Sequence, residues 1–185
     1  MCAPVCELRP DYANVNRRAP DFELPKLGGG TGRLSDYRGK VVIMNYWTKT
    51  CKPCLDELPS LATLAAALRQ RDDMVLITVS TDESLEDVDA TLRSILAGAP
   101  EFPVFLDRGA AVVTGKYGTR LYPETWFIDP DGIIRARVDG SRDWAGPLPM
   151  DLAESLATPL ACPIRVDRGR PEGSWAWLCD PARAG

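Results

Sequence analysis

The sequence predicts an α/β fold of three layers, in which a mixed central β-sheet carries helices on both of its faces. Short runs of apolar, β-branched residues alternate along the chain with longer segments of helical periodicity, as in a largely parallel sheet with helical crossovers. A Pro-Asp-Gly turn between the last two of these runs adds an antiparallel hairpin at one edge. The length of 185 residues, with 45% hydrophobic and 26% charged residues, indicates one globular domain with extensions.

Two continuous apolar runs mark the centre of the sheet. Residues 41–47 (VVIMNYW) and 74–80 (MVLITVS) have the composition of strands that are buried on both faces. A short extended segment is expected before them at residues 19–24, followed by a glycine-rich loop at residues 28–32. The remaining strands are expected at residues 102–106, 125–129 and 133–138.

Helical periodicity follows each of the first two strands. After the first strand, leucine and alanine line one helical face between residues 58 and 68. After the second, Ser84 and Asp87 resemble a capping box at the start of another helix. Two further helices are expected at residues 109–117 and 147–157, which completes the order β-α-β-α-β-α-β-β-α.

The chain divides into three parts on this interpretation. Residues 1–18 are polar and without periodicity, so we expect an irregular N-terminal arm. Residues 19–157 form the compact domain. Residues 158–185 are rich in proline, glycine and arginine and form a C-terminal extension, for which a disulfide tether is a candidate feature.

Composition argues against several classes of function. The formal net charge of −4 suggests neither nucleic acid nor an anionic membrane surface as a partner. No apolar stretch approaches the roughly 20 residues that span a bilayer, and the N-terminus lacks the basic and apolar segments of a secretory signal. The chain has no histidine, the commonest metal ligand and general base, and we expect neither a metal site nor a bound cofactor.

Six cysteines are the most informative feature of the composition. An even number of cysteines in a small chain favours an oxidising compartment. Two of them are central and four lie near the ends of the chain: Cys51 and Cys54, then Cys2, Cys6, Cys162 and Cys179.

The central pair forms the motif Cys51-Lys52-Pro53-Cys54, directly between a buried strand and a long helix. Residues three apart in a first helical turn face the same side, so the two sulfurs can form a small-ring disulfide. Cys51 is expected at the helix N-terminus, where free N–H groups and the helix dipole favour a thiolate, and Lys52 adds a positive charge. Pro53 fits the first turn because no N–H is needed there.

This arrangement predicts a thiol–disulfide oxidoreductase in which Cys51 is the nucleophile and Cys54 the resolving thiol. The Cys51 thiolate attacks a substrate disulfide to form a mixed disulfide, and Cys54 then attacks Cys51 to release the reduced substrate. The same steps in reverse oxidise a substrate dithiol. The expected partner is therefore a protein that carries a disulfide or a dithiol.

Other interpretations of the same residues are open. A zinc site needs four ligands at close spacing, which the other cysteines do not offer, and a structural disulfide does not account for the strand-to-helix placement. A copper carrier would use the same two thiolates. A peroxidase is suggested by Thr48-x-x-Cys51, although Met44 occupies the position where a peroxiredoxin has proline.

Several segments resemble the TlpA/ResA/CcmG family of membrane-associated bacterial thioredoxin-like proteins, a likeness that covers about residues 19–157. The resemblance implies a thioredoxin-like fold and disulfide oxidoreductase activity. It rests on Ala19-Pro20-Asp21-Phe22, Gly39-Lys40-Val41-Val42, Trp47, the Cys51–Cys54 motif, Glu57, Pro59 and residues 122–129 (YPETWFID).

The resemblance implies roles for residues outside the cysteine pair. Pro123 falls on the family's cis-proline, and the backbone of Tyr122 would then pair with an extended substrate. Glu57 would be a partly buried carboxylate that moves protons or raises the pKa of the thiols, with a solvated helix charge as the alternative. Glu124 matches the CcmG branch, as a substrate contact or as an exposed charge.

Trp47 and Lys52, together with Tyr122 and Glu124, make up the substrate-binding surface that we expect around the motif. The sequence departs from the family at Lys49-Thr50, where a more apolar pair ending in an aromatic residue is usual. This departure affects the active-site surface and the reduction potential.

The family usually reduces target disulfides in the periplasm or on the outer face of the membrane, often during cytochrome c maturation. The resemblance therefore implies a periplasmic or membrane-anchored bacterial protein that receives electrons from a membrane donor. Strong oxidants of this fold typically carry histidine inside the motif, and the Lys-Pro pair here favours the reductive direction. An oxidant of folding proteins is the alternative.

The four outer cysteines are candidates for structural disulfides, and they allow three pairings. A bond between Cys162 and Cys179 would stabilise the tail by about 3 kcal/mol, and Cys2 and Cys6 could pair with each other. Cys2 directly follows Met1, as the first residue of a lipid-anchored mature chain would. Unpaired cysteines without a function are the alternative.

Overall fold

The computed structural model describes residues 18–96, 98–157, 165–167 and 170–172. These residues belong to two units of the chain, the larger of which is Arg18–Thr158. The second unit contains an antiparallel pair of short strands, β8 (Arg165–Asp167) and β9 (Arg170–Glu172). All the elements that surround the central cysteines lie in the larger unit.

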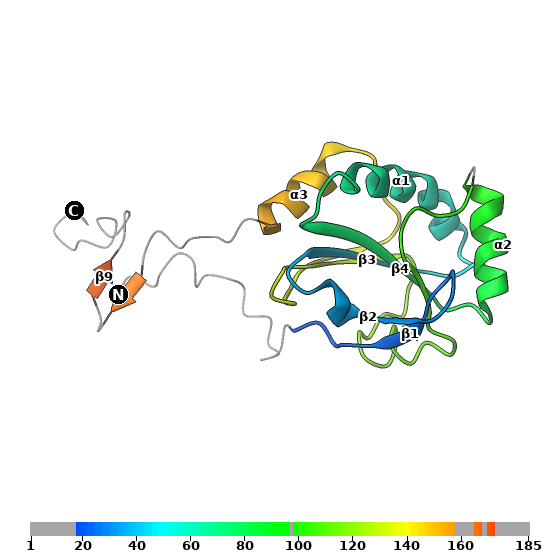
Figure 1. The fold of residues 1–185 in the computed structure, drawn as a ribbon, viewed down its shortest axis with the longest axis horizontal. Helices are drawn as coiled ribbons and strands as arrows, with labels where there is room; N and C mark the ends of the chain where they lie inside the picture. The colour runs from blue at the N-terminus through cyan, green and yellow to red at the C-terminus, as the bar shows by residue number, and fades with distance from the viewer. Residues whose placement is uncertain (1–17, 97, 158–164, 168–169, 173–185) are drawn as a thin grey trace. The chain divides into compact units, whose positions relative to one another are not determined.

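A five-stranded mixed sheet, in the order β5-β4-β3-β6-β7, forms the centre of the larger unit (Figure 1). The strands β3 (Val41–Trp47), β4 (Met74–Ser80) and β5 (Val104–Leu106) are parallel to one another. In the hairpin that follows, β6 (Glu124–Ile128) pairs antiparallel with β3, and β7 (Ile134–Asp139) pairs antiparallel with β6 at the edge of the sheet. Every residue of β3 is buried, because both faces of the strand are covered.

Three α-helices follow strands of the sheet: α1 (Lys52–Leu68), α2 (Leu85–Ile95) and α3 (Pro147–Ala157). In α1 the N-cap is Cys51, and Pro53 lies in the first turn, where its missing N–H leaves no carbonyl unpaired. In α2 the N-cap is Ser84, whose hydroxyl oxygen accepts a hydrogen bond from the Asp87 N–H at 3.1 Å. Both helix starts agree with the sequence-based prediction.

The alternation of side chains along β3 creates two apolar clusters, one on each face of the sheet. Ile43 and Trp47 belong to the cluster that also contains buried residues of α1, α2 and α3. Met44 and Tyr46 belong to the opposite cluster, together with residues of the N-terminal hairpin and of the segment after β5. Figure 1 shows α1 and α3 on one side of the sheet and β1 and β2 on the other. The predicted three-layer α/β fold is confirmed.

The N-terminal hairpin consists of β1 (Glu23–Pro25) and β2 (Thr31–Arg33) and leads into a 3-10 helix, η2 (Leu34–Tyr37). The glycines at 28, 29 and 30 all have positive φ, as the connecting loop requires. The sequence predicts the extended segment and the loop, but not the second strand.

The prediction of a helix at residues 109–117 is wrong, because this segment forms a series of turns. Gly109 and Ala110 both have positive φ, which prevents a regular right-handed helix from starting there. The buried carboxylate of Asp107 accepts hydrogen bonds from the backbone N–H groups of Val112 and Val113, at 2.9 and 2.7 Å. One face of the sheet is therefore covered by α-helices, and the other by η2, the hairpin and these turns.

Within the described part of the chain, no helix combines the length and the apolar character that a membrane span requires.

Candidate functional site

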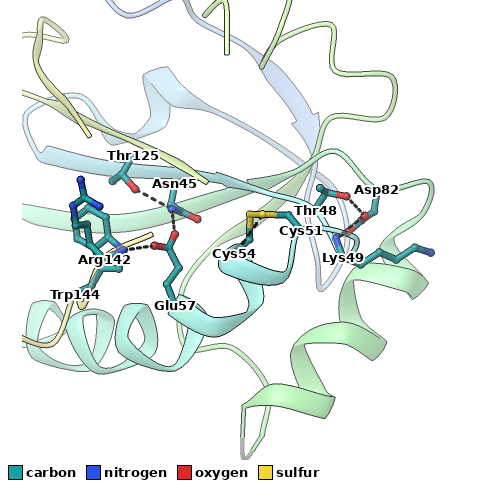
Figure 2. Close-up of a disulfide and its surroundings, with 10 residues drawn as sticks. All are labelled: Asn45, Thr48, Lys49, Cys51, Cys54, Glu57, Asp82, Thr125, Arg142 and Trp144. Carbon is teal, nitrogen blue, oxygen red and sulfur yellow. Dashed lines mark hydrogen bonds between the residues drawn. A yellow bond between two sulfur atoms is a disulfide. The ribbon is translucent and has the colours of Figure 1, made fainter. Parts of the chain in front are cut away.

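Cys51 and Cys54 are joined by a disulfide at the N-terminus of α1, with an S–S distance of 2.08 Å and Cα atoms 5.3 Å apart (Figure 2). Cys51 is partly exposed, whereas Cys54, one helical turn further, is 0% exposed. The Sγ of Cys51 accepts a hydrogen bond from the backbone N–H of Cys54 at 3.2 Å. A thiolate on Cys51 therefore meets the free N–H groups of a helix start, and only this sulfur is open to a substrate.

A cluster of hydrogen bonds holds the carboxylate of Glu57, which is 2% exposed although it lies on the first turns of a surface helix. Its Oε1 accepts from the side-chain amide of Asn45 at 2.8 Å. Its Oε2 accepts from the backbone N–H of Arg142 at 3.0 Å and from the indole N–H of Trp144 at 2.9 Å (Figure 2). The same Asn45 amide donates to the Thr125 hydroxyl at 2.9 Å. The alternative of a solvated helix charge is wrong for Glu57.

Burial raises the pKa of Glu57 above its ordinary value, because removal from water disfavours the charged form. The donors on Trp144, Arg142 and Asn45 stabilise the anion and lower the pKa, but they offset only part of the effect of burial. Glu57 lies one helical turn after Cys54, so a carboxyl group with a raised pKa is one turn from the buried sulfur. Such a group can accept or return a proton when the thiol changes its state.

Replacing Glu57 with glutamine is expected to flatten the pH dependence of stability in the oxidised protein. The raised pKa of Glu57 means that the folded chain binds this proton more tightly than the unfolded chain. The free energy that the bound proton adds to folding is fully present below the ordinary carboxyl pKa and is lost as pH rises through the raised pKa of Glu57. The free energy of unfolding therefore falls with pH between these two pKa values. Urea denaturation of both proteins between about pH 4 and pH 8 checks this slope.

Glu124 also has a pKa raised by burial, but it is present in both proteins, so the difference between them isolates Glu57. Glutamine can occupy the same site, since its carbonyl can accept from Arg142 and Trp144 while its N–H₂ donates to a rotated Asn45 amide. Equal slopes for the two proteins would show that Glu57 does not titrate in this interval.

The Tyr122–Pro123 peptide bond is cis, as the family resemblance implies. Pro123 is buried, and its carbonyl accepts from the N–H of Gly140 at 2.9 Å, beyond the end of β7. Tyr122 is partly buried and packs against the same apolar cluster as Cys51. The segment just before Pro123 also carries Leu121, whose side chain is 83% exposed.

Two of the expected substrate contacts lie in the interior instead. Trp47 is 0% exposed within the cluster beneath the helices, so its indole cannot meet a substrate at the surface. Glu124 is 3% exposed, and its carboxylate accepts from the Thr119 hydroxyl and, at 2.6 Å, from the Trp126 indole N–H. Arg137 forms an ion pair with Glu124 at 3.2 Å. Glu124 thus connects the loop before Pro123 to the sheet through Thr119 and Trp126. The two expectations for Glu124, a substrate contact and an exposed charge, are both wrong.

Lys52 projects into solvent, with 82% of its side chain exposed, and its ammonium pairs with Asp56 at 2.7 Å. An exposed pair of this kind contributes little to stability. Lys52 is therefore available at the surface beside Cys51, where a substrate contact stays a prediction.

Thr48, on which the peroxidase interpretation rests, has its hydroxyl bound to Asp82 rather than to either cysteine. Its hydroxyl donates to the Asp82 carboxylate at 2.7 Å (Figure 2). In the described ranges, no group of three or more histidine, cysteine or acidic side chains is arranged to hold a metal ion. The expected pairings of the outer cysteines, Cys2, Cys6, Cys162 and Cys179, lie outside the described residues.

Sequence reasoning missed three residues of this site. The sequence does contain a signal for Asn45, because a polar residue inside the otherwise apolar run of β3 needs a buried hydrogen-bond partner. Asp82 and Trp144 carried none, since they lie in connecting segments and reach the site only through the fold.

A model of the AhpC/TSA family matches residues 15–137 of this chain. ResA of Geobacillus thermodenitrificans, a thiol-disulfide oxidoreductase, is 33% identical over 127 residues, which cover 69% of this chain and 70% of that protein. The thioredoxin-like protein YneN of Bacillus subtilis is 29% identical over 123 residues, which cover 64% of this chain and 68% of YneN.

Two solved structures share the fold. A protein of Chlorobium tepidum, described as the thiol:disulfide interchange protein DsbE, matches with a TM-score of 0.66 and 26% identity over 75% of this chain and 95% of its own. The exposed lipoprotein thioredoxin Etrx1 of Streptococcus pneumoniae matches with a TM-score of 0.60 and 31% identity over 71% of this chain and 97% of its own.

Proposed function

This chain belongs to the AhpC/TSA family and is a thiol-disulfide oxidoreductase of thioredoxin-like fold, and we propose that it reduces disulfides of exported proteins through Cys51 and Cys54. The observation that carries the proposal is the unequal exposure of the two sulfurs at one helix start. Cys51 is partly open to solvent, and Cys54 is buried directly behind it.

The proposed reaction has two exchanges. In the first, the Cys51 thiolate attacks one sulfur of the substrate disulfide, which forms the mixed disulfide and releases the other substrate sulfur as a thiolate. In the second, Cys54 gives up its proton and attacks the Sγ of Cys51, which releases the second substrate sulfur and leaves the Cys51–Cys54 disulfide. Glu57 is the proposed acceptor of the Cys54 proton, because it is the buried carboxylate one turn away.

Charge around the sulfurs supports the reductive direction. Strong oxidants of this kind stabilise their reduced form as a low-pKa thiolate. The motif here has no histidine to do so, and an ionised Glu57 would raise the thiol pKa values instead. Both features favour the disulfide form of the protein, and so the loss of electrons to a substrate.

The substrate and the location are inferred from the family resemblance and belong to the proposal. We infer an extended polypeptide substrate that pairs with the backbone of Tyr122 beside the cis peptide bond. We also infer a position on the extracytoplasmic face of a bacterium, with a membrane electron donor and a role such as cytochrome c maturation. Etrx1, with 31% identity, is described as an exposed lipoprotein, which supports this location.

A redox titration in thiol–disulfide buffers tests the direction. Trp47 and Cys54 lie in one apolar cluster, so tryptophan fluorescence should report the state of the disulfide, with the Cys51→Ser/Cys54→Ser double variant as the control. A potential near that of thioredoxin, roughly −270 mV, is expected for a reductant. A value near roughly −120 mV would make the protein an oxidant of folding proteins and overturn the proposed direction.

A further inference from the structure

We propose that Asp82 is a positioning residue for thiol–disulfide exchange, because it anchors the turn that presents Cys51 to the substrate. Asp82 lies two residues beyond the end of β4. Its carboxylate binds Thr48, Lys49 and Ser80, and neither cysteine is among these partners. The inference rests on the proposed function in one respect, that Cys51 is the attacking thiol.

The Asp82 side chain is 5% exposed, and both of its oxygens are used. Oδ1 accepts from the Thr48 hydroxyl at 2.7 Å and from the backbone N–H of Lys49 at 2.9 Å. Oδ2 accepts from the Ser80 hydroxyl at 2.8 Å. A buried carboxylate is unfavourable unless donors surround it, so these donors and Asp82 depend on one another.

The residues that Asp82 holds form the first half of the turn that ends at the nucleophile. The Thr48 carbonyl accepts from the backbone N–H of Cys51 at 3.1 Å, which closes a four-residue turn between β3 and α1. The Thr81 N–H also donates to the Trp47 carbonyl at 3.1 Å, so the ends of β3 and β4 are joined at this point. Figure 2 shows Asp82 facing Thr48 and Lys49 on the chain that runs directly into Cys51.

This anchoring determines where the Cys51 sulfur lies relative to the start of α1. Exchange needs three sulfurs in line, and a small displacement of the attacking atom lowers the rate steeply. With Asp82 removed, Thr48 and the Lys49 N–H lose their common acceptor, and the turn can take other conformations. The expected effect is on the rate of attack by Cys51, rather than on stability alone.

The charge of Asp82 can be separated from its anchoring role. Asparagine can keep the carbonyl oxygen that accepts from Thr48 and Lys49, while its N–H₂ donates to the Ser80 hydroxyl oxygen. Alanine removes all three bonds. The neighbouring ammonium of Lys49 forms an ion pair with Asp87 at 2.8 Å, so it keeps its partner in the Asp82→Asn variant.

The experiment compares Asp82→Ala, Asp82→Asn and the wild type, each reduced and then mixed with a small disulfide under conditions where each is folded. We expect Asp82→Ala to react about 10- to 100-fold more slowly, and Asp82→Asn to react at nearly the wild-type rate, with a difference of less than about 1.5-fold. The matched control is Asp129→Ala, which removes another buried carboxylate that accepts from two backbone N–H groups, in the turn between β6 and β7. This turn lies at the end of β3 opposite to the cysteine motif. This control should lower the melting temperature and leave the rate unchanged.

A wild-type rate for Asp82→Ala would overturn the proposal, and so would an equal loss of rate in Asp129→Ala. A rate for Asp82→Asn as low as that of Asp82→Ala would assign the effect to charge and also overturn it. If Asp82→Ala does not fold, Thr48→Val carries the test, because it removes one of the bonds between Asp82 and the turn. A rate about threefold lower supports the anchoring role, and an unchanged rate contradicts it.

Discussion

Replacing Cys51 with serine is expected to lower disulfide reductase activity by on the order of 10³-fold or more, to the background of the assay. A serine hydroxyl at a helix start does not ionise near neutral pH, and it does not form a mixed disulfide. The buried Cys54 cannot replace it, since that sulfur is 0% exposed. The measurement is reduction of a disulfide-bonded model protein with dithiothreitol as the electron source.

Cys54→Ser is the matched control, because it removes the other sulfur of the same disulfide. This variant keeps the attacking thiol and loses the resolving one, so it should react once and stay attached to its substrate. Non-reducing gel electrophoresis and mass spectrometry would show the adduct on Cys51. A trapped adduct in Cys51→Ser, or none in Cys54→Ser, would contradict the assignment of nucleophile and resolving thiol.

Replacing Trp144 with alanine is expected to destabilise the oxidised protein by about 3–5 kcal/mol. The indole is 2% exposed, packs near Phe127 with ring centroids 6.3 Å apart, and donates to Glu57 at 2.9 Å. Its backbone N–H also donates to the Ser60 hydroxyl oxygen at 3.1 Å, so Trp144 fixes the connection between β7 and α3 against α1. Alanine leaves a cavity and removes one donor from a buried carboxylate.

Trp144→Phe separates these two contributions, because the ring stays while the N–H is lost. Its expected destabilisation is about 1–3 kcal/mol, the usual effect of removing one partner from a buried polar group. Urea denaturation of the three proteins measures both values. Equal destabilisation by alanine and phenylalanine would show that the hydrogen bond, rather than packing, accounts for the role of Trp144.

The parts of the fold that local sequence could predict are those in which one pattern decides the structure. The bounds of β3, β4 and α3 match the expected ranges because a continuous apolar run or a full amphipathic repeat leaves no competing arrangement. The cysteine motif was predicted for the same reason, since both sulfurs belong to one helical turn. Segment 109–117 was misjudged because a single buried side chain, Asp107, takes backbone N–H groups that a helix would use otherwise.

The hydrogen bonds of Glu57 and Asp82 depend on partners that lie far away in the chain. The bond between Glu57 and Trp144 joins residues 87 positions apart, and the bond between Thr48 and Asp82 joins residues 34 positions apart. No local pattern encodes such pairs, because each residue is compatible with solvent until the sheet brings it to its partner. The same holds for Glu124, which follows Pro123 in sequence and nevertheless points into the interior.

The amide of Asn45 gives the buried carboxylate a neighbour that suits either of its protonation states. Its N–H₂ now donates to Glu57 and Thr125, while its Oδ1 has no hydrogen-bond partner among the described residues. A half-rotation of the amide would exchange the two ends, so that Oδ1 could accept from a protonated Glu57 and from the Thr125 hydroxyl. A proton on Glu57, one turn from Cys54, can thus be accommodated by rotation of this amide and of the Thr125 hydroxyl, with no shift of the surrounding sheet and helix.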